Sequence, residues 1–282
     1  MKRLVFLIFI SSLFTYCQTN NEYYIEKIAE GFQFTEGPVW MDGNLLFSDI
    51  PENKVYQWNP EKGTEIFLDP SGNSNGLALD SEGNLLLAQH GKRRVARIVD
   101  GVETALVDTF EGKKLNSPND MTIHSDGSIY FTDPPYGIGE DDEELGFYGI
   151  YKLTLDGEII LLDKSLVRPN GLAFSLDETK LYVADSQERK IYVWNVDENG
   201  KLSGKKLFID MKSDKRGASD GMKMGNDGLL YATGPGGLWI IDSNGNALAT
   251  IDIPGQTTNC NWGPNGEILY ITSGDAVYKL KK

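Results

Sequence analysis

The chain has 282 residues, of which 40% are hydrophobic, so it can bury a core as one large domain or two ordinary ones, and wholesale disorder is excluded. Its 41 acidic and 27 basic residues give a net charge of −14, the charge of a well-solvated surface. Such a surface repels polyanions, so we expect no nucleic-acid partner.

The chain begins with a pattern typical of an export signal. A basic start precedes an apolar run over residues 4–14, which is too short to span a bilayer as a helix. We predict that residues 1–20 are a signal peptide of an exported bacterial protein. Cys17 stands where a lipoprotein carries its lipidated cysteine, although Phe14 and Tyr16 depart from the usual lipobox. Two outcomes stay open: a lipid anchor at Cys17, which would be the sole membrane contact, or cleavage and release into the periplasm.

One sequence pattern recurs six times along the remaining chain. It begins with Glu, Asn or Asp and continues with a predicted strand, a tight turn and a second predicted strand. The units begin 39 to 51 residues apart, close to the about 40 to 50 residues that a four-stranded propeller blade needs. They open at Glu36, Asn75, Asn119, Asn170, Asp220 and Asn259. Asp-Gly, Glu-Gly and Asn-Gly turns separate the strand patterns, and no stretch keeps a helical period, so almost no helix is predicted.

The strand patterns can be placed most fully in the first and fourth units. In the first unit we predict strands at Glu36–Met41, Asn44–Asp49, Lys54–Asn59 and Thr64–Leu68. In the fourth we predict Asn170–Ser175, Lys180–Asp185, Lys190–Asn195 and Lys205–Asp210. Both units therefore fit a blade of four antiparallel strands.

The last unit offers only three strands, which are predicted at Thr257–Trp262, Glu267–Thr272 and Ala276–Leu280. The strand-like segment Tyr23–Ala29 precedes the first unit and supplies the missing strand. Pairing the first strand with the last one closes the ring and protects its edges. The sequence thus predicts an all-β protein, a single six-bladed β-propeller of four-stranded blades over residues 22–282.

Two segments break the regular repeat. Residues 134–147 (PPYGIGEDDEELGF) follow the second strand of the third unit, and residues 196–206 (VDENGKLSGKK) precede the outer strand of the fourth. Long connections of this kind are often binding loops. We expect the first segment, called the insertion below, to overhang the site, to set specificity and to contact substrate through Tyr136. The second is expected to be a surface hairpin.

Polar residues are predicted to converge at one end of the propeller channel. The first strand of each blade lines the channel, so the six opening residues enter it at one rim, and the second strands return there with Asp49, Asp133 and Asp185. Carboxylate and amide oxygens without Cys or clustered His suit a hard divalent cation. The alternative, that Asn or Asp before Gly forms Asx turns and inter-blade hydrogen bonds, stays open, above all for Asn75 and Asn259.

Other chemistries have little support in the sequence. It contains no P-loop, GxGxxG or HExxH motif and no EF-hand spacing. Beyond the export segment Cys260 is the one cysteine, so neither a disulfide framework nor a CxxC metal site is expected. His124 lies within a first strand and is expected to pack or to form a hydrogen bond. His90 ends a second strand at the rim, where it either contacts substrate or is structural.

At these residues the chain resembles the SMP-30/gluconolactonase/luciferin-regenerating enzyme family, and within it the bacterial gluconolactonases. The matching segments are EGPVW (36–40), QHGKRRVAR (89–97), NSPNDMTIHSDGSIYFTDPPYG (116–137), RPNGLAFS (168–175), SDGMKMGNDGLLYAT (219–233) and TTNCNWGPNGEILYIT (257–272). The resemblance implies that Glu36, Asn170 and Asp220 hold one divalent cation and that Asn119 contacts substrate. Animal members have an Arg where this chain has Ser117, a departure that leaves the substrate more open than the reaction.

The reaction implied by the resemblance is hydrolysis of a cyclic ester. A divalent cation, calcium first and magnesium, manganese or zinc as alternatives, polarises the carbonyl, while Asp220 is both ligand and general base. We therefore expect a metal-dependent lactonase acting on a sugar-acid lactone such as gluconolactone. The candidate substrate contacts are Asn119, Ser117, His90, Asn75, Asn259 and Tyr136. The alternatives are a non-catalytic calcium- or sugar-binding propeller and another ester or phosphotriester hydrolase.

Overall fold

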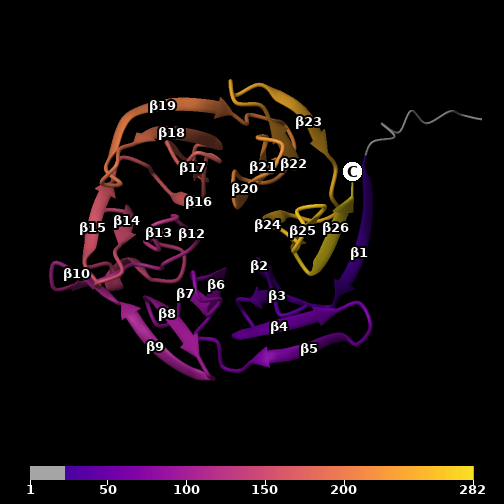
Figure 1. Cartoon of the computed structure of the whole chain (residues 1–282), viewed down its shortest axis with the longest axis horizontal. Coiled ribbons are helices and arrows are strands. Elements are labelled where there is room, and N and C mark those ends of the chain that lie inside the picture. Colours follow the sequence, from indigo (N-terminus) through magenta and orange to yellow (C-terminus); the bar gives the residue numbers. More distant parts are fainter. Residues whose placement is uncertain (1–22, 282) are drawn as a thin grey trace, which may run out of the picture.

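Each sequence repeat folds as a meander of four antiparallel strands, because its short apolar runs are joined by tight turns at Gly-containing pairs. The computed structural model describes residues 23–281, and in it six such sheets form a ring around a central channel (Figure 1). The strand nearest the channel is the first of each blade, and the last strand lies at the outside of the ring. The predicted six-bladed β-propeller is confirmed.

The blades follow one another along the chain. Blade one consists of β2 (Thr35–Met41), β3 (Asn44–Asp49), β4 (Lys54–Asn59) and β5 (Gly63–Leu68). Blade two consists of β6 (Ser74–Leu79), β7 (Leu85–Gln89), β8 (Arg94–Val99) and β9 (Val102–Val107). Blade three consists of β12 (Met121–Ile123), β13 (Ile129–Asp133), β14 (Gly149–Leu153) and β15 (Ile159–Asp163).

The second half of the ring repeats this order. Blade four consists of β16 (Pro169–Phe174), β17 (Lys180–Asp185), β18 (Lys190–Val196) and β19 (Leu202–Asp210). Blade five consists of β20 (Met222–Met224), β21 (Leu230–Gly234), β22 (Gly237–Ile241) and β23 (Ala247–Ile251). Blade six consists of β24 (Thr257–Trp262), β25 (Ile268–Ser273), β26 (Ala276–Lys281) and β1 (Tyr24–Glu30).

The ring is closed by the first and last strands of the described chain. β1 pairs antiparallel with β26, with Tyr24 opposite Lys281 and Glu30 opposite Ala276, so blade six is built from both ends (Figure 1). Near the channel, the Thr258 hydroxyl donates to the Thr35 carbonyl oxygen at 2.8 Å and joins blade six to blade one. The predicted closure is confirmed.

Two details differ from the expected strand pattern. β19 begins at Leu202, three residues before the predicted Lys205, because Leu202 is buried while the polar residues after it face solvent from an outer strand. The segment before it is a tight hairpin, in which the Asp197 amide donates to the Lys201 carbonyl oxygen, so the expected surface hairpin is confirmed. A small hairpin of β10 (Thr109–Phe110) and β11 (Lys113–Lys114), between blades two and three, was not predicted.

The insertion leaves blade three after β13 and returns at β14. It contains η1 (Glu140–Asp142), which is the one helical element between residues 23 and 281. The Asn116 amide donates to the carbonyl oxygens of Asp133 at 3.2 Å and Phe147 at 3.0 Å. Both ends of the insertion are therefore held by one buried side chain.

Buried hydroxyls near the channel join neighbouring blades. The Thr132 hydroxyl donates to the Asn170 carbonyl oxygen at 2.8 Å, from blade three to blade four. The Ser186 hydroxyl donates to the Ser219 carbonyl oxygen at 2.8 Å, from blade four to the segment that enters blade five. These bonds position the first residues of the inner strands, where the predicted site lies.

We expect Thr132→Val to lower the free energy of unfolding by about 1–2 kcal/mol, because the isosteric side chain leaves a buried carbonyl oxygen without its donor. Urea unfolding measures the change. Thr104→Val is the matched control, since the Thr104 hydroxyl is exposed and donates only at 3.4 Å. Equal free energies for the two variants would show that the inter-blade hydroxyl contributes nothing.

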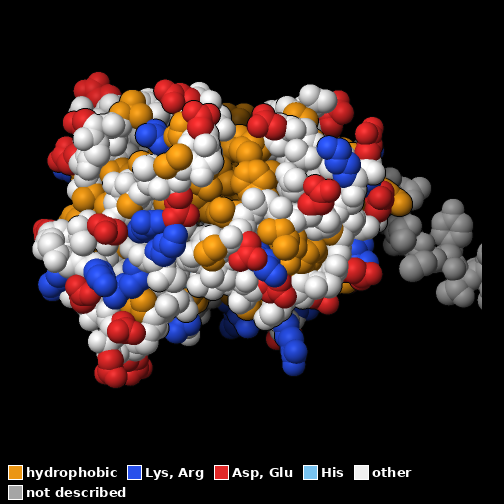
Figure 2. All heavy atoms as spheres, turned by 90° about the horizontal axis from the view of Figure 1, so that it is seen from below, with side chains coloured by type: hydrophobic (Ala, Val, Ile, Leu, Met, Phe, Trp, Pro, Cys, Tyr) orange, Lys and Arg blue, Asp and Glu red, His pale blue; other side chains and the backbone are white. Residues whose placement is uncertain are grey.

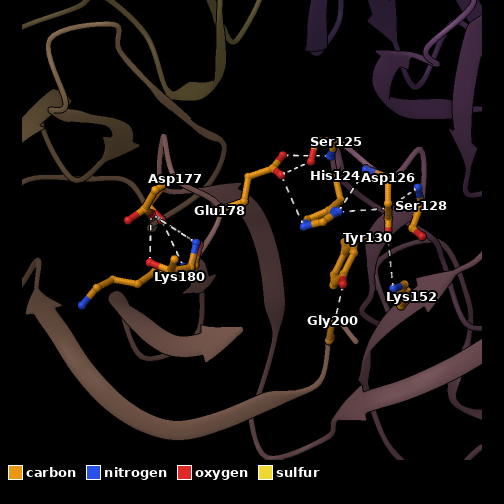
Figure 3. Close-up of polar contacts among 12 residues, drawn as sticks. His124, Ser125, Asp126, Ser128, Tyr130, Lys152, Asp177, Glu178, Lys180 and Gly200 are labelled. Atoms are coloured by element: carbon orange, nitrogen blue, oxygen red, sulfur yellow. Dashed lines mark hydrogen bonds and ion pairs between the residues drawn. The ribbon is translucent and has the colours of Figure 1, made fainter. Parts of the chain in front are cut away.

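His124 directly follows β12, one residue beyond the strand in which it was expected, and so lies at the rim away from the start of the inner strands. Figure 3 shows its ring between Asp126 of blade three and Glu178 of blade four. Its Nδ1 accepts a hydrogen bond from the Asp126 amide at 3.2 Å, and its Nε2 lies 3.4 Å from a Glu178 carboxylate oxygen. The ring packs edge-on against Phe174, with centroids 5.2 Å apart. The expectation that His124 packs and forms hydrogen bonds is confirmed.

The acidic side chains do not gather in one patch on the face drawn in Figure 2, where they alternate with basic and apolar ones. Over residues 23–281 no helix has the length and apolar character needed to cross a membrane. The predicted signal peptide at residues 1–20 and the predicted lipidation of Cys17 lie outside the described residues and stay predictions of the sequence.

Candidate functional site

The opening residues of the repeats point into the channel because the inner strands are irregular there. The pairing of β2 with β3 shifts between Glu36 and Val39, and that of β16 with β17 shifts between Pro169 and Leu172. Gly171 follows Asn170 at this irregularity, and a Cβ at Gly171 would overlap the Asp220 carbonyl oxygen of the next blade. The glycine therefore allows close packing of inner strands and does not form a turn.

The irregular strand starts surround a cavity of about 520 Å³ at one end of the channel. Seven predicted site residues line it: Glu36, Asn75, His90, Asn119, Tyr136, Asn170 and Asp220. Its wall also contains residues that sequence reasoning missed: Phe34, Ile50, Pro51, Arg168, Ser186, Gln187, Arg189, Gly217, Ala218 and Gln256. Most missed residues flank the recognised motifs, whereas Arg168 is the first residue of the recognised segment RPNGLAFS, and this was the signal for it.

Three buried carboxyl groups lie at the inner end of this cavity, and two of them, Glu36 and Asp220, are part of its wall. Glu36 is 3% exposed, Asp220 is 9% exposed and Asp120 is 2% exposed. The Asn259 amide donates to Glu36 Oε2 at 3.1 Å and to Asp120 Oδ2 at 3.2 Å, which holds these two side chains together. Asp120, which follows Asn119, was not recognised from the sequence.

Burial governs the electrostatics of this acidic group. Burial first, and the neighbouring Asp120 second, raise the pKa of Glu36 to about 8. Burial, then Glu36 and Asp120, hold the pKa of Asp220 well above that of an ordinary carboxyl group. Like charges this close cannot all ionise at low cost unless a cation compensates them.

Unpaired oxygens at the cavity wall fit such a cation. Asn75 Oδ1, Asn170 Oδ1 and Asp220 Oδ1 are buried and accept no hydrogen bond from the described part of the chain. The Asn170 amide nitrogen donates to the Ser186 hydroxyl at 2.9 Å, and this bond fixes the orientation of the Asn170 oxygen. Oxygen ligands with two carboxylates are what calcium or magnesium prefers, so Glu36, Asn170 and Asp220 fit a hard divalent cation.

The candidate cation site differs from one built only from His, Cys, Asp and Glu side chains. Within residues 23–281 no three His, Cys, Asp or Glu side chains are grouped as a metal site. Here two carboxylates combine with amide oxygens.

His90 and Asn75 form a pair on the cavity wall. Burial lowers the pKa of His90 to about 4, so the ring is neutral near pH 7. Asn75 Nδ2 lies 3.2 Å from His90 Nε2, which can then accept the hydrogen bond, and this leaves the Asn75 oxygen unpaired. The insertion adds Tyr136 to the same wall.

Two predicted substrate contacts lie away from the cavity wall. Ser117 is fully buried, and its hydroxyl accepts a hydrogen bond from the Gly137 amide at 2.8 Å, so it anchors the insertion. Asn259 lies lower in the channel, where it holds Glu36 and Asp120. Its inter-blade hydrogen bonds agree with the structural alternative considered for it.

The aspartates at the ends of the second strands are also beneath the surface. Asp49 accepts hydrogen bonds from the amides of Gln33 and Phe34, and Asp185 accepts them from Val167 and Arg168. Asp133 Oδ2 accepts hydrogen bonds from the backbone amide of Asn116 at 2.8 Å and from its side-chain amide at 3.1 Å. These carboxylates hold the segments that enter the inner strands. The ends of β3 and β17 lie beside the mouth as expected, since Ile50, Pro51, Ser186 and Gln187 line the cavity, but the buried Asp49, Asp133 and Asp185 side chains are not part of its wall.

A second cavity of about 550 Å³ lies between blades five and six, at the turn ends of the inner strands. Its wall includes Tyr231 and Trp262, whose rings pack edge-on with centroids 4.9 Å apart. It contains none of the buried carboxyl groups or unpaired oxygens described above. The chemistry is therefore assigned to the cavity at the channel mouth.

Known proteins are similar to this chain in both sequence and fold. Residues 34–275 match the family model described as the SMP-30/Gluconolactonase/LRE-like region. The gluconolactonase of Zymomonas mobilis is 38% identical over an alignment of 287 positions, which covers 91% of this chain and 81% of that protein. The pentonolactonase of Haloferax volcanii is 26% identical over 249 residues, which cover 84% of this chain and 80% of that protein.

The similarity extends to a solved structure. A gluconolactonase from Xanthomonas campestris superimposes with a TM-score of 0.85 at 31% sequence identity, covering 92% of this chain and 89% of the other. Because the family model spans most of the chain, the predicted relationship is confirmed. The chain belongs to the SMP-30/gluconolactonase/LRE-like family.

Proposed function

We propose that this protein hydrolyses the ester bond of a sugar-acid lactone with the help of a divalent cation held by Glu36, Asn170 and Asp220. The observation that carries the proposal is the cavity at the channel mouth, where buried carboxyl groups of raised pKa meet unpaired oxygens. The lactonases of Zymomonas mobilis and Haloferax volcanii, both relatives of this chain, support it.

The residues of the cavity have different roles in the proposed hydrolysis. A divalent cation at this place would polarise the lactone carbonyl and stabilise negative charge on its oxygen. Asp220 takes a proton from the attacking water, whose oxygen bonds to the carbonyl carbon while the ring C–O bond breaks. The proton passes to the ring oxygen, and the product is a hydroxy acid. A carboxylate whose pKa is well above its ordinary value suits this task near neutral pH.

The cavity wall matches a polyhydroxylated ring. Its volume of about 520 Å³ lies in the range of small-molecule sites, which is roughly 300–1,000 Å³. Asn119, Gln187 and Tyr136 place polar groups around the wall. We propose calcium as the first candidate cation, because an oxygen-only set of buried ligands without Cys or His is typical of it.

A panel of lactones tests the proposal. Hydrolysis releases acid, so a pH indicator can follow gluconolactone and two pentonolactones, each corrected for spontaneous hydrolysis. We expect turnover in calcium, loss of turnover in EDTA, and recovery when excess calcium is restored. Turnover unchanged by EDTA would contradict the role of the cation.

The same panel separates the two alternative functions. Tight calcium binding without turnover of any lactone would favour a non-catalytic binding propeller. Turnover of a neutral phosphotriester such as paraoxon, in place of lactones, would favour a phosphotriester hydrolase. Either result would contradict the proposed function.

A further inference from the structure

The six repeats allow a comparison of equivalent positions around the channel mouth. The position two residues before each opening residue is occupied by Phe34, Asn73, Ser117, Arg168, Ala218 and Thr257. Its backbone amide donates to Asp49 in blade one, at 3.2 Å, and to Asp185 in blade four, at 3.1 Å, so the positions are structurally equivalent. Arg168 alone is charged, which means that the propeller itself does not require a charge there.

Arg168 is placed where a bound ligand can reach it. It lines the cavity together with Phe34 and Ala218 from equivalent positions, and its side chain is exposed. Its guanidinium carbon lies 5.6 Å from the centroid of the Tyr136 ring, a cation–π contact that positions the group without using its N–H donors. The only hydrogen bonds of Arg168 to described residues use its backbone.

Tyr136 links this guanidinium to the acidic floor. Burial raises the pKa of Tyr136, Ser186 lowers it, Asp220 raises it, and Asn170 and Arg168 lower it. All four of these residues line the same cavity as Tyr136. The guanidinium therefore stands at the outer end of a cavity whose inner end carries the proposed ester chemistry. A substrate that spans the cavity would meet both ends.

The other arginine of the cavity wall already has a structural role. Arg189 Nη1 donates to the Ser213 carbonyl oxygen at 3.2 Å, in the segment that enters blade five. Arg93 occupies the same turn of blade two, with a similar left-handed backbone, and donates to the Leu115 carbonyl oxygen in the segment that enters blade three. A structural role repeated in two blades therefore accounts for the presence of Arg189, whereas no such role accounts for Arg168.

Neighbouring acids do not neutralise Arg168. Burial and then Glu143 raise the pKa of Tyr148, Arg168 lowers it, and Glu140 raises it, so the acids nearest to Arg168 in this region belong to the insertion. Glu143 accepts a hydrogen bond from the Tyr148 hydroxyl at 2.9 Å, and no carboxylate of residues 23–281 lies within ion-pair distance of Arg168. In a chain of net charge −14, an unpaired guanidinium at the mouth is a local attraction for an anion.

We propose that Arg168 recognises an anionic group, a carboxylate or a phosphate, carried by the lactone at the end remote from its ester. This inference rests on the proposed lactonase function and makes Arg168 a determinant of specificity. Guanidinium groups bind both anions through paired N–H donors, so the two share one chemistry. A neutral lactone would fill the same cavity without this contact.

Three lactones test the inference: neutral D-glucono-1,5-lactone, D-glucaro-1,4-lactone with a free carboxylate, and 6-phospho-D-glucono-1,5-lactone. We expect Arg168→Gln to lower kcat/KM about 10- to 100-fold for at least one anionic lactone, mostly through KM, and far less for the neutral one. Arg168→Lys should keep part of the preference. The lactone with the larger loss distinguishes carboxylate from phosphate.

Charge itself needs a matched control. Arg97→Gln removes the same charge at the opposite rim, where Arg97 lies 3.5 Å from Asp80, and should leave the ratio of anionic to neutral kcat/KM unchanged. In the wild type, kcat/KM for the preferred anionic lactone should fall as salt is added, and this salt dependence should weaken in Arg168→Gln.

The outcomes separate this inference from the function on which it rests. Turnover of the neutral lactone with equal losses for all three in Arg168→Gln, or with no loss for any, contradicts the role of Arg168 alone. A wild type that prefers the neutral lactone contradicts it as well. Failure to hydrolyse any of the three contradicts the proposed function and this inference together.

Discussion

Asp220→Asn is expected to lower kcat for lactone hydrolysis by about a thousandfold, the size of effect that removal of a positioned general base produces. The substitution keeps the shape and one oxygen but removes the charge and the proton acceptor. Asp220 Oδ1 is buried without a hydrogen-bond partner in the described chain, and the pKa of Asp220 is raised by burial, Glu36 and Asp120. No other carboxyl group of the cavity wall combines these properties.

The measurement must separate loss of the base from loss of the cation. kcat is therefore determined at saturating calcium, with the Kd for calcium measured on the same variant by calorimetry. Asp252→Asn, at an exposed acid that pairs with Lys215, is the control for loss of one negative charge and should stay within twofold of the wild type. If Asp220→Asn binds calcium and retains wild-type kcat, the base is a different residue.

Removal of divalent cations is expected to destabilise the protein more at pH 8 than at pH 6.5. In the unfolded chain Glu36 has its ordinary pKa of 4.5, whereas in the folded, metal-free chain the pKa is about 8. The folded state therefore holds the proton more tightly, and stability is lost as pH rises between these values. The raised pKa of Asp220 acts in the same direction.

A cation that binds the folded state offsets this loss, so the gain in Tm on adding calcium to EDTA-treated protein should be larger at pH 8. Burial of His90 has the opposite sign, because its folded pKa of about 4 lies below the ordinary 6.5, and most of its effect on stability falls below pH 6.5. Asp133, whose pKa is raised to about 7, acts like Glu36.

Glu36→Gln measures how much Glu36 contributes to the pH dependence of stability and to the calcium-induced gain in Tm. The variant should lose much of the pH dependence of metal-free stability between pH 6.5 and 8, and most of the calcium-induced gain in Tm. Thermal unfolding in EDTA and in calcium at the two pH values provides the comparison. An equal gain at both pH values in the wild type would mean that Glu36 does not share the cation site.

The fold was predictable because its determinants are local and repeated. Turns such as Asp42–Gly43, and the recurring strand patterns, specify a meander without reference to the rest of the chain. Repetition at blade length then implies a ring, and the leftover strand implies its closure. The outer strand β19 was placed less well, since an exposed edge strand needs few apolar residues to mark its start.

The candidate site was predictable only where equivalent positions in the six repeats indicate which residues lie at the same rim. Because the inner strands begin at one rim, Glu36, Asn170 and Asp220 could be grouped from their equivalent places in the repeats, and the structure brings them to one cavity. Symmetry could not tell which equivalent residues stay buried. Ser117 and Arg168 occupy the same place in two blades, yet one anchors the insertion and the other is exposed at the cavity mouth.

The sequence by itself determined the blade count, the ring closure and the set of oxygen-bearing residues at the channel mouth, because short-range turn chemistry and strand periodicity control these features. The tertiary structure alone decided the proton affinities of Glu36 and Asp220, the place of Asp120 beside them and the free guanidinium of Arg168. These depend on burial and on distances between blades, which follow from irregular inner-strand geometry and have no signature within any single repeat.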